Sequence, residues 1–203
     1  MAAQAPPEGR YHHGDLRRAV LDGALTAIAA DGPAALSLRD VARRAGVSHA
    51  APAHHFGDKA GVLTAIAAEG YTLLAAALRD ALADGDDDLM QGGIAYIRFA
   101  LDHRAHFEVM FRPELYRPDD QAVVAARQAA AEIMFGAVGD ILGEAGDEEV
   151  WGGVLAVWSF THGFATLTLD SNFDPERGDS VEAAVHTAGA AVMRLAAAGA
   201  FKQ

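Results

Sequence analysis

The chain has 203 residues, is 51% hydrophobic and contains no cysteine. Its abundance of alanine predicts a helical globular protein of one large or two small domains, and the lack of cysteine excludes disulfides and thiolate metal sites. The net charge of −12 would oppose DNA binding if it were spread evenly, but residues 1–65 contain seven Lys and Arg against six Asp and Glu. The remaining residues contain nine Lys and Arg against 22 Asp and Glu. We therefore expect the N-terminal third to be able to approach DNA while the acidic remainder faces away from it.

Residues 1–13 are expected to form a flexible arm. They have no apolar stretch like that of a signal peptide, which together with the absence of cysteine favours a cytoplasmic protein. Residues 10–13, Arg-Tyr-His-His, could lie over phosphates or in a minor groove, and a solvated tail fits the same residues equally well. A first helix is then predicted from residue 14 or 15 to residue 31, where Gly32 and Pro33 end it.

Two short helices joined by a tight turn are predicted next. The apolar residues of 38–45 recur at i, i+3, i+4 and i+7, which places them on one stripe of a helix. Gly46 stands where that helix must end, in a position that favours left-handed backbone. Ser48 suits the N-cap of a second helix over 48–56. The arrangement is a helix-turn-helix, whose second helix can enter the major groove of DNA.

The residues that follow make this pattern more specific. His55-Phe56-Gly57-Asp58-Lys59, followed by Val62-Leu63, closely resembles the end of the DNA-binding domain in TetR/AcrR-family repressors. The resemblance covers about residues 14–72. It implies an all-helical homodimer, with a helix-turn-helix domain over 14–57 and a ligand-sensing and dimerisation domain over 58–203.

The resemblance also implies which side chains meet a pseudo-palindromic double-stranded operator. The expected contacts are Ser37, Ser48, His49, Ala50, His54, His55 and Lys59. The serines and Lys59 would bind phosphates, and the histidines would reach base edges or phosphates. Asp58 can cap the helix that begins with Lys59. For Lys59 itself, a solvated surface side chain is the alternative to a phosphate contact. Two residues depart from the family: Ala53 stands where a phosphate-binding tyrosine is usual, and Pro52 constrains the first turn and can shorten the helix.

Six further helices complete an all-α chain of about nine helices. They are expected over residues 58–84, 89–102, 105–111, 120–142, 148–169 and 180–198. The first of them would connect the two domains. The acidic run 84–88 begins like a calcium loop but lacks the glycine and the later glutamate that such a loop needs, so a solvated turn is expected.

The helix over 148–169 has an unusual composition. From Val150 to Leu169 it has no Asp, Glu, Lys or Arg, and this uncharged stretch is long enough to span a bilayer. Its glycines, its threonines and His162 instead predict a buried helix of a soluble protein. Small residues on one stripe would let a partner helix approach closely, so we expect a dimer interface there and on the last helix. The expected interface residues are Gly152, Ala156, Ser159, Gly163, Val185 and Val192. Trp158-x-x-x-His162-Gly163 also resembles the Trp-x-x-x-His-Gly (WHG) type of C-terminal domain in TetR-like regulators.

Aromatic residues on the fifth to eighth helices predict an effector pocket. The candidates are Tyr96, Phe99, Phe107, Met110, Phe111, Met134, Phe135, Trp158 and His162. Apolar walls would supply affinity for a small, largely apolar molecule, and His162 would orient it. Aromatic residues at helical spacing also form ordinary core, and that alternative stays open for each of them.

These observations predict a transcriptional regulator, a repressor that releases its operator when an effector shifts the population of dimer conformations. A DNA-binding or protein-interaction adaptor without an effector is the alternative. An enzyme with His162 as a base is less favoured, because no nucleophile, base and orienting group share a diagnostic spacing. Histidine pairs at 12–13, 54–55 and 103–106 could bind zinc, but no carboxylate has the matching spacing. We therefore expect no metal, no other cofactor and no membrane association.

Overall fold

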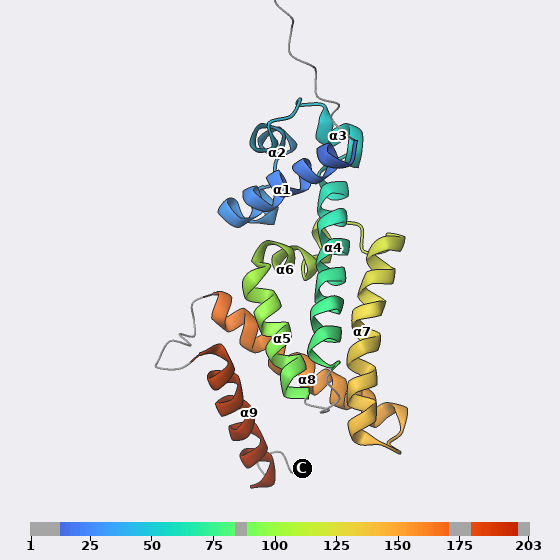
Figure 1. The fold of residues 1–203 in the computed structure, drawn as a ribbon, viewed down its shortest axis with the longest axis vertical. Helices are drawn as coiled ribbons and strands as arrows, with labels where there is room; N and C mark the ends of the chain where they lie inside the picture. The colour runs from blue at the N-terminus through green and yellow to red at the C-terminus, as the bar shows by residue number, and fades with distance from the viewer. Residues whose placement is uncertain (1–12, 84–88, 171–179, 199–203) are drawn as a thin grey trace, which may run out of the picture.

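The computed structural model describes residues 13–83, 89–170 and 180–198, and these form an all-α fold (Figure 1). No strand occurs in the described ranges, as the sequence predicts. The α-helices are α1 (His13–Asp31), α2 (Leu38–Ala45), α3 (Ala51–Phe56), α4 (Lys59–Ala81), α5 (Leu89–Asp102), α6 (Arg104–Met110), α7 (Gln121–Leu142), α8 (Asp147–Leu169) and α9 (Val181–Ala197). Two 3-10 turns, η1 (Pro33–Ala35) and η2 (Pro113–Leu115), join α1 to α2 and α6 to α7. Residues 1–12 of the predicted arm over 1–13 lie outside the described residues, as do residues 84–88 and 171–179, whereas His13 is the first residue of α1.

Helices α1, α2 and α3 pack together at one end of the molecule (Figure 1). Val20, Ala24 and Ile28 of α1 are buried, in the apolar spacing that the sequence shows. Gly46 ends α2 with φ of 66°, and its N–H donates to the carbonyls of Ala42 and Arg43. The predicted left-handed turn between the two short helices is therefore present, and it fixes the angle at which α3 leaves α2.

Helix α4 connects this end to the rest of the fold. It runs from beneath α3 down the side of α7 (Figure 1), and it packs against α1, α5, α6 and α7. Asp58 caps it, accepting a hydrogen bond of 2.8 Å from the N–H of Gly61, as predicted. Because α4 contributes buried side chains to both halves, from Val62 and Leu63 near its start to Leu74 and Leu78 near its end, one continuous core extends through the molecule.

The remaining helices form the second half of the fold. Helices α5 and α7 flank α4, α8 crosses against α5 and α7, and α9 packs against α5. Helices α4 and α7 are long and apolar enough to cross a membrane by length and composition alone. For α4 the apolar composition is explained by its place in the core between the two halves.

Candidate DNA-binding face and sensing core

The predicted recognition helix is shorter than expected. The sequence predicts a helix over 48–56 with Ser48 as N-cap, whereas α3 begins at Ala51 and no side chain caps it. The N–H of Ala51 instead donates to the carbonyl of Ser48 at 3.0 Å, which forms a tight turn before the helix. Pro52 is buried in the second position of α3, where its missing N–H needs no intrahelical partner.

Most of the side chains expected to contact DNA are exposed. Ser37, Ser48, His49, Ala50 and His54 are exposed, whereas His55 and Lys59 are partly buried. Ala53, which stands in the position of the usual tyrosine, is exposed as well. The ammonium of Lys59 donates to the carbonyl of Ala34 at 2.6 Å, which fixes it beside η1 in the first turn of α4. The face is thus a set of small and imidazole side chains around a six-residue helix.

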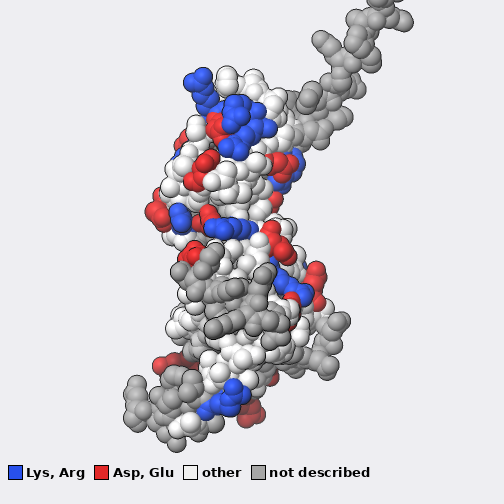
Figure 2. Space-filling view, turned by 90° about the vertical axis from the view of Figure 1, so that its left-hand side faces the viewer, with Lys and Arg blue, Asp and Glu red and all other residues white. Residues whose placement is uncertain are grey.

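Acidic residues bind most of the basic side chains of α2. Asp40 pairs with Arg43 and, at 2.5 Å, with Arg44, whose guanidinium also lies 3.4 Å from Asp31. The hydrogen bonds from the two arginines, that from Arg44 first, lower the pKa of Asp40. Figure 2 shows one face, on which Lys and Arg gather at the top of the molecule with Asp and Glu lying directly against them.

An ion pair joins the start of α4 to the segment before α7. Arg117 Nη2 donates to both carboxylate oxygens of Asp58, at 2.9 and 2.8 Å, and the N–H of Arg117 donates to Thr64 Oγ1 at 3.1 Å. The pKa of Asp58 is lowered, chiefly by the hydrogen bond from the N–H of Gly61 and then by the charge of Arg117. The residue that caps α4 therefore also attaches it to the second half of the fold.

A second network joins α1, α4 and α6. Arg18 Nη1 donates to the two carboxylate oxygens of Glu69 at 2.8 and 2.9 Å, and Arg18 also binds Asp22. On the other side, Nε2 of the buried His106 lies 3.3 Å from Glu69 Oε1. Burial lowers the pKa of His106, and the neighbouring carboxylate of Glu69 opposes that shift. The sequence does not indicate this network, because Arg18 and Glu69 are far apart along the chain and neither belongs to a motif.

Five of the nine pocket candidates meet in one aromatic cluster, formed by Tyr96, Phe107, Phe111, Trp158 and His162. The ring of His162 stacks on Phe107, with centroids 5.2 Å apart, and meets Phe111 edge-on at 4.4 Å. The Tyr96 hydroxyl lies 2.9 Å from His162 Nδ1 and accepts a hydrogen bond from Trp158 Nε1 at 3.3 Å.

The hydrogen bonds of Tyr96 determine the protonation of His162. Burial raises the pKa of Tyr96 and lowers that of His162, so the phenol keeps its proton and the imidazole is neutral. Trp158 can only donate to the Tyr96 oxygen, so His162 Nδ1 is the acceptor that the buried O–H of Tyr96 needs, and this arrangement places the imidazole proton on Nε2. His162 therefore offers one N–H donor inside an aromatic environment.

The other four pocket candidates lie elsewhere. Met110 is buried against α4 beside Gly70. A Cβ added at Gly70 would lie 2.5 Å from Met110 Sδ. Phe135 stacks on Trp151 with centroids 6.0 Å apart at the surface between α7 and α8. Met134 lines a small cavity next to Tyr96, and Phe99 lines a larger cleft.

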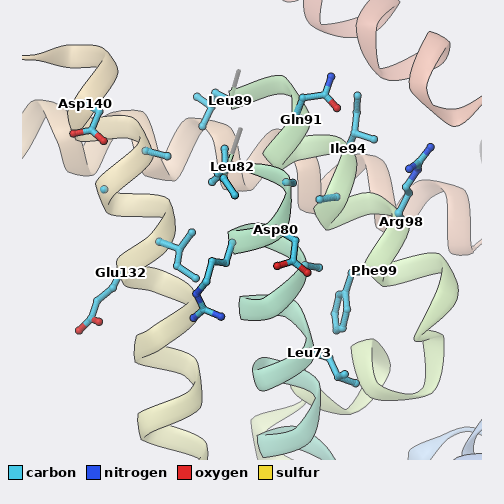
Figure 3. Close-up of a pocket in the computed structure, with 18 of the residues that line it drawn as sticks. Leu73, Asp80, Leu82, Leu89, Gln91, Ile94, Arg98, Phe99, Glu132 and Asp140 are labelled. Atoms are coloured by element: carbon cyan, nitrogen blue, oxygen red, sulfur yellow. The ribbon is translucent and has the colours of Figure 1, made fainter. Parts of the chain in front are cut away.

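These two hollows differ in size and lining. The small cavity, of about 20 Å³, is lined by apolar residues and by Thr161 and Tyr96 between α4, α5, α7 and α8. The cleft, of about 970 Å³, is open (Figure 3). Leu82 and Leu89 lie at its α4–α5 end, and Asp140 and Glu132 extend from α7. Within the described ranges, no three His, Asp or Glu side chains come together as metal ligands.

An exposed apolar face runs along α8. Gly152, Ala156 and Ser159 are exposed and Gly163 is half-buried, and a methyl group at Gly152 or Gly163 would meet nothing within 4 Å. The large side chains beside this stripe are also exposed: Trp151 is 51%, Leu155 43% and Trp158 39% accessible. Val192 of α9 is exposed too. Val185 differs from the other expected interface residues, because it is buried within the subunit at 0% exposure and offers no surface to a second one.

Comparisons with known proteins agree with this geometry. The family model "Bacterial regulatory proteins, tetR family" matches residues 20–66, and "Tetracyclin repressor-like, C-terminal domain" matches residues 89–188. The WHG subtype stays a prediction. None of the curated proteins is similar in sequence.

Solved structures are similar over nearly the whole chain. A protein with unknown function from Rhodococcus sp. RHA1 is 33% identical, with a TM-score of 0.75, over 92% of this chain and 98% of its own. The TetR family transcriptional regulator PfmR from Thermus thermophilus is 24% identical, with a TM-score of 0.67, over 86% and 97%. A regulatory protein of the tetR family from Rhodococcus RHA1 is 21% identical, with a TM-score of 0.67, over 89% and 96%. Because both halves match family models in the expected order, the chain belongs to the TetR family of bacterial transcriptional regulators.

Proposed function

We propose that the protein is a cytoplasmic, homodimeric repressor that binds a pseudo-palindromic operator and releases it when a small, largely apolar molecule enters the C-terminal half. The observation that carries the DNA-binding part is the exposed face of α3 next to the left-handed turn at Gly46. His49 and His54 would read base edges, and Ser37, Ser48 and Lys59 would hold phosphates. Membership of a family of regulators favours this role over catalysis.

The position of α6 supports a ligand response. One side of this helix contributes Phe107 to the aromatic cluster around His162, and the preceding residue, His106, binds Glu69. Glu69 in turn binds Arg18 of α1. A molecule that inserted among the rings at His162 would move α6, and α6 could not move without disturbing its contacts with α1 and α4.

The exposed face of α8 supports dimerisation. Its small residues, Gly152, Ala156, Ser159 and Gly163, would allow a partner helix to approach, and Val192 of α9 would flank them. The accessible Trp151 and Leu155 would add apolar area. The proposed interface omits Val185 because it is buried within the subunit. Sedimentation of Gly152→Trp, with Gly139→Trp on α7 as a control for the added side chain, tests the assignment. A dimer that persists in Gly152→Trp contradicts it.

The experiment that tests DNA binding is fluorescence anisotropy on DNA from the region upstream of the gene, against scrambled DNA, over a range of salt concentrations. We expect selective binding that weakens in Lys59→Ala, with a shallower dependence on salt because one phosphate contact per subunit is lost. Arg127→Ala, which removes an exposed cation from α7, should change neither. If neither upstream DNA nor fragments selected from the whole genome bind selectively, the proposal is wrong.

A DNA-binding protein without an effector is the second candidate, and the small size of the cavity beside Tyr96, about 20 Å³, favours it. A ligand at the aromatic cluster would therefore have to displace side chains rather than fill existing space. A panel of apolar compounds tested for release of bound DNA separates the two functions. Release that is abolished in His162→Phe supports an effector site at the cluster, and a panel without any release favours the second candidate.

A further inference from the structure

The basic side chains of the N-terminal half differ in what binds them. Arg18 is held by Asp22 and Glu69, and the arginines near the end of α2 are held by Asp40 and Asp31. Lys59 donates to a backbone carbonyl. Ion pairing thus neutralises three of the six cations that the structure describes in this half. Any cation that has no acidic partner contributes disproportionately to phosphate binding.

Arg17 is such a cation. It is exposed on α1, and no acidic side chain pairs with it among the residues that the structure describes. Its guanidinium carbon lies 5.1 Å from the centre of the Phe56 ring. A guanidinium over an aromatic ring keeps its N–H donors free, because the ring attracts the charge without accepting a strong hydrogen bond. Arg39 is also exposed without an acidic partner in the described ranges, but no aromatic ring there holds it.

The ring that holds Arg17 belongs to the recognition helix. Phe56 is the last residue of α3, and α1 packs against α3. The guanidinium is therefore fixed at the end of the helix that carries the exposed His54. When that helix lies in the major groove, the phosphates of the adjoining strand border its ends.

We propose that Arg17 binds a DNA backbone phosphate at the end of α3, and that the ring of Phe56 positions it for this contact. The inference rests on the proposed DNA-binding function. Docking on Phe56 restricts the side chain before DNA arrives, so less rotamer freedom is lost on binding. The contact is independent of sequence, and it partly replaces the phosphate contact that Ala53 cannot make.

The test is the dependence of binding on salt, measured by anisotropy between 50 and 200 mM salt on any duplex, including random sequence. Each phosphate contact contributes a slope of about 0.9 in log K against log salt, so Arg17→Ala should make the slope of the dimer shallower by about 1.8. Between 50 and 200 mM salt, the factor by which the affinity of the variant falls is therefore about tenfold smaller than that of the parent protein. Arg127→Ala, with the same change in net charge, should keep the parent slope. Circular dichroism verifies that each variant is folded.

Arg17→Lys separates charge from positioning. It should retain the slope, because the charge still binds phosphate, but bind several-fold more weakly than the parent, because an ammonium packs less well on the Phe56 ring. If Arg17→Ala has the slope and affinity of Arg127→Ala, the assignment of Arg17 is wrong and DNA binding itself stands. If the parent protein shows no salt-dependent binding to duplex DNA, both the assignment and the proposed function are wrong.

Discussion

Replacing His162 by Phe tests the hydrogen-bonded core of the aromatic cluster. Phe keeps a flat ring against Phe107 and Phe111, so little packing is lost. The change removes Nδ1, which accepts the O–H of Tyr96 at 2.9 Å. Tyr96 is only 2% exposed, and its hydroxyl hydrogen would then have no acceptor and no ready access to water. Leaving a buried donor unsatisfied costs about 1–3 kcal/mol, so we expect the free energy of unfolding to fall by that amount.

A second substitution distinguishes this cause from altered packing. Tyr96→Phe in the His162→Phe background removes the unsatisfied hydroxyl and leaves only Trp158 Nε1 without its partner. Trp158 is 39% exposed, so its N–H can reach water at little cost. The double variant should therefore be more stable than His162→Phe alone, by about 1–2 kcal/mol.

Urea unfolding at pH 7.5 and at one protomer concentration gives the required free energies, since the stability of a dimer depends on concentration. In thermal melts, each kcal/mol should shift Tm by about 2–4 °C for a chain of this size. The reasoning fails if His162→Phe is as stable as the parent protein. It fails equally if adding Tyr96→Phe restores nothing.

Three further predictions concern other parts of the molecule. Burial lowers the pKa of His106 and of His162 from about 6.5, so below that pH the unfolded chain binds more protons than the folded one. The free energy of unfolding should therefore fall as pH decreases from 6.5 towards 5. A urea midpoint that is constant over this window would contradict this prediction. Gly46→Ala should lower stability by about 1 kcal/mol in thermal melts, because Gly46 has φ of 66°, and an unchanged Tm would show that the turn is not left-handed in solution. Glu69→Gln should weaken the bonds of this side chain to Arg18 and His106, and so loosen the attachment of α1 to α6. Amide hydrogen exchange should therefore accelerate in these two helices and not in α7.

Periodicity and end signals are sufficient to predict the helices of this chain. The apolar spacing of 38–45 and Gly46 together predict where α2 ends, and the structure ends it there. The recognition helix is predicted less well, because Ser48 has the chemistry of an N-cap but the chain makes a further turn before α3 starts at Ala51. Burial of Pro52 accompanies this later start, and a local cap preference of about 1 kcal/mol does not outweigh such packing.

The candidate site is predicted in part for a different reason. Helical spacing tells which residues share a face, but it does not tell which neighbouring helix covers that face. Phe107, Trp158 and His162 meet in one cluster, whereas Phe135 lies at the surface against Trp151 and Val185 lies in the core. Contacts between side chains far apart in sequence have no local signal at all.

The length of α4 has a consequence for the range of motion that DNA binding can tolerate. A helix of 23 residues is roughly 35 Å long, so a tilt of about 5° about its far end displaces the end next to α3 by about 3 Å. That displacement is several times the roughly 0.5 Å range of distances over which N–H···O bonds form. Under the proposed function, a rotation of α4 by this amount would therefore be sufficient to carry α3 out of register with the bases that it contacts.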